Sequence, residues 1–269
     1  MQHVPAADKR SLIRRAYFDL IGLPPRPEDI TAFLNDTRPD AYARLVDKLL
    51  ASPQYGERWG RHWLDVARYS DAKDGVLMYG DARIRPFAYT YRDYVIRAFN
   101  DDTPFDEFVR EQLAADKMQL PIGSPKLAGM GFLTLGRLFD NNIHDVIDDQ
   151  IDVVSRGFLG LTASCARCHD HKLDPLPQRD YYRFMAFFHN INRYGVRNAK
   201  SVAQFSLRDI MAPREQSQHQ EQVKDHLQRV EKIEKQIAAI EKKVIGDFQS
   251  VEKEDFKFEQ HKIPLLKKR

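Results

Sequence analysis

The chain has 269 residues, which is enough to bury a substantial core and allows one or two domains. Its 42 Lys and Arg residues nearly balance 39 Asp and Glu residues, and the signs are mixed along most of the chain, so nothing indicates nucleic-acid binding. No apolar run approaches the roughly 18 to 20 residues of a membrane span, and the N-terminus lacks the basic-then-apolar pattern of a signal peptide.

Three helices are predicted in the first fifty residues. Apolar residues recur at helical spacing from Asp8 to Ile21, and the sequence Gly-Leu-Pro-Pro at 22–25 ends the run. Pro27 at a first-turn position, followed by two carboxylates, begins a second helix, because carboxylates stabilise the positive end of a helix. A third helix runs from about residue 39 to residue 50.

A fourth helix is predicted to start at Ser52 and Pro53, and it carries an unusual polar face. Helical spacing places four polar residues on that face: Arg58, His62, Asp65 and Tyr69. Asp65 lies within reach of His62 and is expected to orient its ring, and both tryptophans of the chain flank the face. The face is interpreted either as a solvated surface or as a site where His62 and Asp65 act as acid/base groups.

The middle of the chain is predicted to be helical as well. A loop at 71–81 is followed by an aromatic helix from about Pro86 to Phe99. Thr103 and Pro104 begin the next helix, with four apolar residues directed inward: Phe105, Phe108, Val109 and Leu113. Residues 126–138 fit a helix or a buried strand, and a helix is favoured.

A helical stripe over residues 142–163 leads directly to the only two cysteines of the chain, in the motif Cys165-Ala166-Arg167-Cys168-His169. This spacing is that of covalent attachment of c-type haem. Cys165 and Cys168 would add to the two vinyl groups of the macrocycle, and His169 would be the proximal iron ligand. The motif therefore predicts haem c as the cofactor.

Three other interpretations of the motif remain. A Cys-x-x-Cys pair can be a dithiol redox switch, although such pairs usually follow a strand and open a helix. It can be half of a zinc site completed by His169 or His171, although structural zinc usually takes two separated ligand pairs and no second cysteine pair exists. It can also be two buried thiols with no special chemistry.

A distal iron ligand is expected from a distant segment, because His171 is too close to His169 to reach the opposite face of a porphyrin. His171 is better placed at the haem edge. His62 is the preferred distal ligand, since Asp65 can hold its ring and raise its basicity. The other candidates are His144, His189, Met130 and Met185.

After the motif, residues 171–177 form a proline-stiffened turn, and residues 179–188 form an aromatic helix. From about 215 to 245 a three-four repeat predicts a coiled-coil helix that can bind a partner, with His226 in the same seam as Val223, Val230, Ile233, Ile237, Ile240 and Val244. The fold class is all-α: a multi-helix haem-binding domain over residues 1–200, then a linker, the coiled-coil helix and a basic tail over 201–269.

Four motifs in order carry a family resemblance: Phe-Asp-Leu-Ile-Gly-Leu-Pro-Pro at 18–25, Arg-Trp-Gly-Arg-His-Trp-Leu-Asp-Val-Ala-Arg-Tyr at 58–69, Phe-Val-Arg-Glu-Gln-Leu at 108–113, and Ser-Cys-Ala-Arg-Cys-His-Asp-His-Lys-Leu-Asp-Pro at 164–175. Through them the chain resembles the planctomycetal cytochrome c-associated domain family, a domain of unknown function. The resemblance implies an exported protein and supports the haem interpretation. Because covalent haem is attached outside the cytoplasm, a periplasmic or other extracytoplasmic location is expected, with an export signal upstream or already removed.

The leading functional hypothesis is a haem module that passes electrons to a partner cytochrome or within a larger oxidoreductase. The second is a haem-dependent oxidoreductase with an open iron position, acting on a carbohydrate-type substrate, with His62, Asp65 and His171 as acid/base groups. The third is a structural metal-binding scaffold whose coiled coil recruits a partner.

Overall fold

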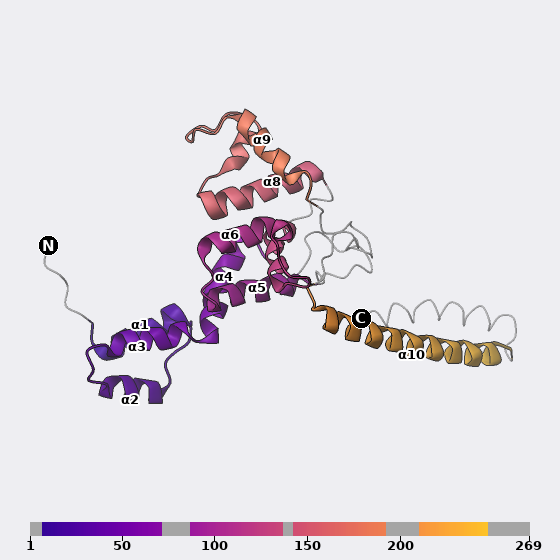
Figure 1. Cartoon of the computed structure of the whole chain (residues 1–269), viewed down its shortest axis with the longest axis horizontal. Coiled ribbons are helices and arrows are strands. Elements are labelled where there is room, and N and C mark those ends of the chain that lie inside the picture. Colours follow the sequence, from indigo (N-terminus) through magenta and orange to yellow (C-terminus); the bar gives the residue numbers. More distant parts are fainter. Residues whose placement is uncertain (1–6, 72–86, 137–141, 192–209, 247–269) are drawn as a thin grey trace. The chain divides into compact units, whose positions relative to one another are not determined.

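The computed structural model describes residues 7–71, 87–136, 142–191 and 210–246. All regular structure in these residues is helical, which confirms the all-α prediction (Figure 1). The described residues group into two compact units, one made of 7–71, 87–120 and 125–191 and the other of 121–124 and 210–246. The predicted domain boundary near residue 200 and the predicted loop at 71–81 lie almost wholly outside the described residues.

Three short helices form the N-terminal part of the first unit: α1 (Lys9–Leu20), α2 (Pro27–Asn35) and α3 (Ala41–Leu50). The Asp8 carboxylate caps α1 by accepting a hydrogen bond from the Ser11 amide at 2.9 Å. The three helices bury a small core of seven residues: Ile13, Ala16, Tyr17, Phe33, Ala41, Leu45 and Leu49. The three helices predicted for this region are confirmed.

Helices α4 (Pro53–Val66) and α5 (Ala88–Asn100) pack closely, with Gly56 and Gly60 of α4 at the contact. A Cβ on Gly56 would lie 2.3 Å from the Ile96 carbonyl oxygen, so the backbones meet at a distance that only glycine allows. The Gly56 amide donates to the Asn100 side chain at 2.8 Å. Ser52 precedes α4 as predicted, but its side chain does not cap the helix.

Helix α6 (Phe105–Ala114) corrects one prediction about its inward face. Phe105 is 66% exposed, whereas the buried residues of the helix are Phe108, Glu111 and Gln112. After α6 come two 3-10 segments, Ala115–Lys117 and Pro125–Met130, and the short helix α7 (Gly131–Thr134). The helical interpretation of this region is therefore confirmed over the strand alternative.

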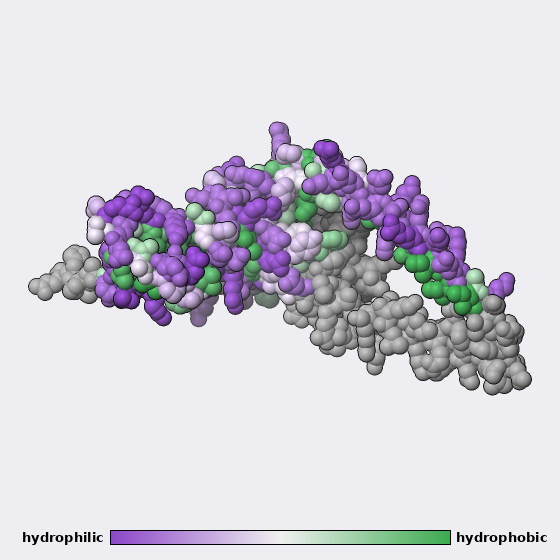
Figure 2. Space-filling view, turned by 90° about the horizontal axis from the view of Figure 1, so that it is seen from below, coloured by the Kyte–Doolittle hydropathy of each residue, from purple (hydrophilic) through white to green (hydrophobic). Residues whose placement is uncertain are grey.

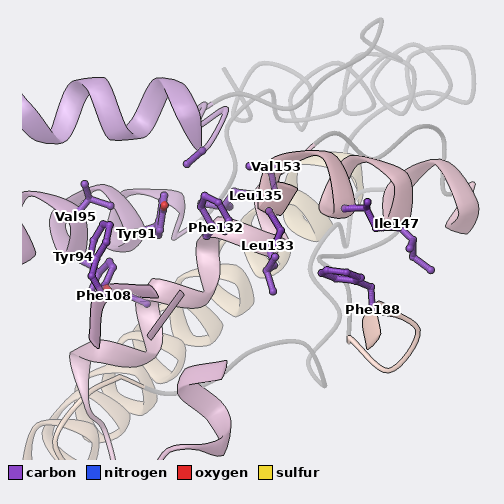
Figure 3. Close-up of a cluster of buried hydrophobic side chains, with 14 of the residues drawn as sticks. Tyr91, Tyr94, Val95, Phe108, Phe132, Leu133, Leu135, Ile147, Val153 and Phe188 are labelled. Atoms are coloured by element: carbon purple, nitrogen blue, oxygen red, sulfur yellow. The ribbon is translucent and has the colours of Figure 1, made fainter. Parts of the chain in front are cut away.

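The main core of the first unit is rich in aromatic side chains (Figure 3). A buried polar network adjoins it. Trp63 Nε1 and the Tyr91 hydroxyl both donate to Gln112 Oε1, at 2.8 and 2.7 Å. The Tyr94 hydroxyl donates to Glu111 Oε2 at 2.8 Å, and Lys126 Nζ lies 2.7 Å from Glu111 Oε1. The polar side chains that α6 buries are thus paired with groups from neighbouring elements, and Lys126 meets Glu111 Oε1 as an ion pair.

Helix α8 (Ile143–Val154) continues into a π-helical turn, Ser155–Leu159, and this helical run stops at Gly160. Gly160 has a φ of 66°, a left-handed conformation that stops the helix. The cysteine motif starts in a separate 3-10 segment, Ala163–Arg167, so the prediction that one long helix leads directly into it is wrong. Helix α9 (Gln178–Phe188) follows and buries Tyr181 and Phe188.

In the second unit, α10 (Pro213–Gly246) is one continuous helix of 34 residues, which confirms the predicted C-terminal helix. Large apolar side chains lie along one side of it (Figure 2) and are 39% to 64% exposed: Val223, Leu227, Ile233, Ile237 and Ile240. The pairing of this helix with another stays a prediction. Among the described helices, none combines the length and the apolar content that a membrane span requires.

Candidate functional site at the cysteine motif

The two cysteines and the histidine of the motif face solvent, whereas the residues between them face the protein. Cys165, Cys168 and His169 are exposed, and both thiols are free. Ala166, between the cysteines, is fully buried in the main core, and Ala163 at the start of the same 3-10 segment is buried as well. The backbone therefore presents the three chemically reactive side chains together on one exposed segment.

Arg167, the second residue between the cysteines, ties this segment to the two neighbouring helices. Its guanidinium lies 2.8 Å from the Asp145 carboxylate and 3.4 Å from the Asp148 carboxylate, both on α8. Its carbonyl oxygen accepts hydrogen bonds from the side chains of Gln178 and Tyr182 on α9, at 3.2 and 3.1 Å. The motif is thus fixed from both sides.

Asp148 also connects α8 to α9 directly, because the Tyr181 hydroxyl donates to it at 2.5 Å. Burial and the neighbouring Asp148 raise the pKa of Tyr181, so this phenol stays protonated and remains a donor. Sequence reasoning missed these supporting residues. The signal that could have found them is the pair of carboxylates at 145 and 148, which share a face of α8, together with an arginine inside the motif.

The main chain sets the tautomer of His169. Its Nδ1 lies 2.7 Å from the Asp170 carbonyl oxygen, and because a carbonyl oxygen can only accept, Nδ1 carries the proton. Nε2 then keeps its lone pair, which is the arrangement of a ligating histidine whose other nitrogen donates to a backbone carbonyl. The Asp170 carboxylate caps α9 by accepting from the Gln178 amide at 2.8 Å, which holds this residue in place.

His171 is held in the opposite way. Its Nδ1 accepts hydrogen bonds from the amides of Asp174, at 2.8 Å, and Leu173, at 3.3 Å. The His171 amide donates to the Leu176 carbonyl at 2.9 Å, so ring and main chain together close the predicted proline-stiffened turn. Because Nδ1 is an acceptor, any acid/base role of His171 falls to Nε2.

His62 and Asp65 are both exposed on α4, and within the described residues no hydrogen bond joins them. The His62 ring lies against Trp59, with 5.6 Å between ring centroids, while Trp63 turns into the core. The Tyr69 hydroxyl, expected on the same face, donates to Asp71 at 2.5 Å. In the described part of the chain no hydrogen bond or ring contact links His62 to Cys165, Cys168 or His169.

The other candidate distal ligands are spread over several elements. His144 is exposed in the first turn of α8, and His189 is exposed at the end of α9. Met130 accepts a hydrogen bond from the Asp116 amide through its sulfur at 3.4 Å. Met185 is partly buried against the main core.

The donor set fits covalent haem. Two free exposed thiols stand three residues apart, and the adjacent histidine keeps a free Nε2 lone pair. Large apolar side chains in the surrounding segment are also exposed, as a surface that contacts a macrocycle requires: Leu159, Leu173, Tyr182 and Phe187. Over the described ranges, no group of three or more His, Cys, Asp or Glu side chains is arranged to hold a metal ion.

A family model described as PSCyt2, protein of unknown function (DUF1549), matches residues 1–193, which include all of the first unit that the structure describes. No curated protein and no solved structure matches the chain.

Proposed function

The chain belongs to the PSCyt2 family of proteins of unknown function (DUF1549), and we propose that it is an extracytoplasmic c-type haem module that transfers electrons. The observation that carries the proposal is the contrast between anchored and exposed residues within the motif. Ala166 and Arg167 hold the segment to the protein, while Cys165, Cys168 and His169 stay free at the surface. This arrangement suits a segment whose thiols are alkylated by a large cofactor.

Each residue of the motif has a distinct role in this proposal. The Cys165 and Cys168 sulfurs would hold the macrocycle through thioether bonds, and His169 Nε2 would ligate the iron. His169 Nδ1 keeps its proton and donates it in a hydrogen bond to the Asp170 carbonyl oxygen. This hydrogen bond orients the ring and raises the basicity of Nε2. Bound haem supplies a one-electron couple at iron. The expected partner is an electron-transfer protein or a cytochrome domain.

The test uses the fact that the chain contains only two cysteines. The full chain, fused to an export signal and produced in a bacterial host with a cytochrome c maturation system, should give a haemochrome spectrum in pyridine typical of two thioether links. Mass spectrometry should place the haem on the peptide containing 165–168. The double variant Cys165→Ala/Cys168→Ala should carry no covalent haem. A wild-type chain that binds zinc and no haem would overturn the proposal.

The nature of the sixth iron position separates electron transfer from catalysis. His62 is the candidate that the sequence favours for the second iron ligand; in the structure its ring is exposed on α4 and lies against Trp59 instead of being held by Asp65. His62→Ala should convert the ferric haem from low-spin to high-spin in electron paramagnetic resonance, whereas His144→Ala, which removes another exposed histidine, should not. An unchanged low-spin signal in His62→Ala would show that His62 is not an iron ligand. A wild type that is already high-spin would favour a haem oxidoreductase over an electron-transfer module.

A further inference from the structure

The apolar seam of helix α10 is largely exposed (Figure 2). In a heptad repeat written abcdefg, its a and d positions hold Val223, Val230, Ile233, Ile237 and Ile240. Four of these five side chains are 39% to 64% exposed. A continuous apolar surface of this kind marks an interaction site, and a helix of 34 residues, about 51 Å long, offers several heptads of it.

The charges beside the seam favour a parallel partner of the same sequence. Arg229 stands at g, and Glu234 stands at e of the next heptad. In a parallel coiled coil, g of one helix meets the following e of the other, so each copy's Arg229 would meet the partner's Glu234. An antiparallel pair sets g beside g and e beside e, which brings no opposite charges together at these positions.

Arg229 and Glu234 do not serve each other within one helix, because only residues three or four apart are neighbours on a helix surface. In the structure the Arg229 guanidinium lies 3.0 Å from the Asp225 carboxylate, and these side chains are 77% and 64% exposed. An ion pair this exposed contributes little to stability, so it does not hold Arg229 away from a partner.

Two histidines in the seam favour the same alignment. His219 and His226 occupy the d positions of the two heptads before the first d isoleucine. In a parallel pair in register, each histidine meets its own counterpart and every apolar layer meets an apolar layer. An antiparallel pair that spans the layers from 223 to 240 would set His226 against Ile237, which buries a polar ring against an apolar side chain. A polar seam position of this kind specifies register in coiled coils.

We propose that α10 forms a parallel, in-register coiled coil with a second copy of this chain. The seam supplies the apolar contact, two symmetric pairs of Arg229 with Glu234 flank it, and the histidine layers fix the register. Because β-branched residues at both a and d also suit three strands, a third copy would use the same seam and the same charge pairs. The inference goes beyond the proposed function and does not depend on haem.

The mass of the full chain in solution is the first test. At about pH 8, where histidine side chains are neutral, sedimentation should give at least twice the 31.3 kDa of one chain. Ile237→Asp should weaken the association by about 100-fold or more, because it buries an unpaired charge in the seam. Gln228→Asp, at the outward f position, is the matched control and should associate as the wild type does. A wild type that stays a single chain at all concentrations overturns the proposal.

The competing occupant of the seam is this chain's own residues 247–269. A shortened chain that ends at Gly246 tests it by the same sedimentation measurement. Association of both the full and the shortened chain supports the proposal. A full chain that stays single while the shortened chain associates shows that residues 247–269 cover the seam, and this overturns the proposal.

Charge reversal tests the pairing between copies. Arg229→Glu and Glu234→Arg should each weaken association at low salt by about 5-fold, because each brings like charges together in a parallel pair. The double variant should associate more tightly than Arg229→Glu, since both lack the contact with Asp225 and only the contact between copies differs. Effects of the two reversals that simply add would overturn the pairing.

Disulfide trapping tests the orientation directly. In a full chain with Cys165→Ala and Cys168→Ala, which replace two exposed residues, Val223→Cys should form a covalent dimer on air oxidation. This follows because only a parallel pair in register places residue 223 against its own counterpart while keeping the apolar layers together. Gln228→Cys, on the outward side, should remain uncrosslinked. A Val223→Cys chain that associates but does not crosslink overturns the parallel arrangement.

Discussion

The guanidinium of Arg167 lies 2.8 Å from the carboxylate of Asp145, so one of the two residues between the cysteines is bound to the first turn of α8. Both side chains of this pair are about one third exposed, at 35% and 33%. The contact therefore positions the motif more than it stabilises the whole fold, because partly exposed ion pairs contribute modestly to the free energy of unfolding.

Replacing Arg167 with Gln should lower the free energy of unfolding by about 1 kcal/mol, which corresponds to a melting temperature about 2–4 °C lower. The expected larger effect is on the yield of covalent haem, since the cysteines lose their tie to α8. Arg183→Gln removes an exposed ion pair with Asp180 on α9 and should change neither quantity. Equal haem yields from Arg167→Gln and the wild type would show that the anchor does not matter for attachment.

Two glycines of α4 offer a matched test of the α4–α5 contact. Gly56→Ala should lower the free energy of unfolding by about 1–3 kcal/mol, because the new Cβ would lie 2.3 Å from the Ile96 carbonyl oxygen. In Gly60→Ala the new Cβ would lie 3.4 Å from its nearest neighbour, which is the Ile96 side chain and not backbone. Alanine also has a higher helix propensity than glycine. Urea unfolding should therefore separate the two variants, and equal stabilities would contradict the close backbone contact.

In the dissociated chain, the apolar side of α10 should be detectable as solvent-exposed hydrophobic surface. Leu227→Gln/Ile237→Gln should reduce fluorescence of a bound hydrophobic dye and leave the melting temperature of the chain within about 2 °C, because both side chains are already exposed, at 60% and 39%. Gln228→Ala/Gln236→Ala changes neighbouring polar positions and should leave dye binding unchanged. A large drop in melting temperature of the first variant would show that the stripe is covered.

Breaker residues and end signals made the helices predictable. Asp8 caps α1, Pro27 begins α2, and the prolines at 175 and 177 prevent a helix before α9, so element positions follow from local chemistry. The boundary between α8 and the motif was not predictable from apolar spacing. The stripe continues past Gly160, where one left-handed residue stops the helix.

The buried face of α6 could not be predicted from the hydrophobic pattern either. Glu111 and Gln112 are buried because Tyr94, Lys126 and Trp63 reach them from other elements, and such partners are known only once the chain is folded. For the candidate site, the spacing of the cysteines predicts haem attachment, and this stays a prediction. The tautomers of His169 and His171 depend on main-chain atoms and could not be read from side-chain types.

The stability of the N-terminal helices should depend on pH through Asp29. Lys48 donates to Asp29 Oδ1 at 2.9 Å and Arg26 donates to Oδ2 at 3.1 Å, so α2 and α3 are joined by this carboxylate. These hydrogen bonds, with that of Lys48 the largest cause, lower the pKa of Asp29 from its ordinary 3.8 to about 2. A pKa that is lower in the folded chain means that the contribution to stability is complete above about pH 4 and is lost as the pH falls toward 2.

Asp29→Asn should accordingly destabilise the chain by about 2 kcal/mol at pH 7, and the difference from the wild type should fall by roughly half at pH 3. Urea unfolding followed by circular dichroism at both pH values measures it. Asp19→Asn, an exposed carboxylate on α1 that forms no ion pair within the described residues, should show no such dependence. If Asp29→Asn were equally destabilising at both pH values, the loss would come from packing or from the helix start, because neither of those contributions is released when the carboxylate takes up a proton.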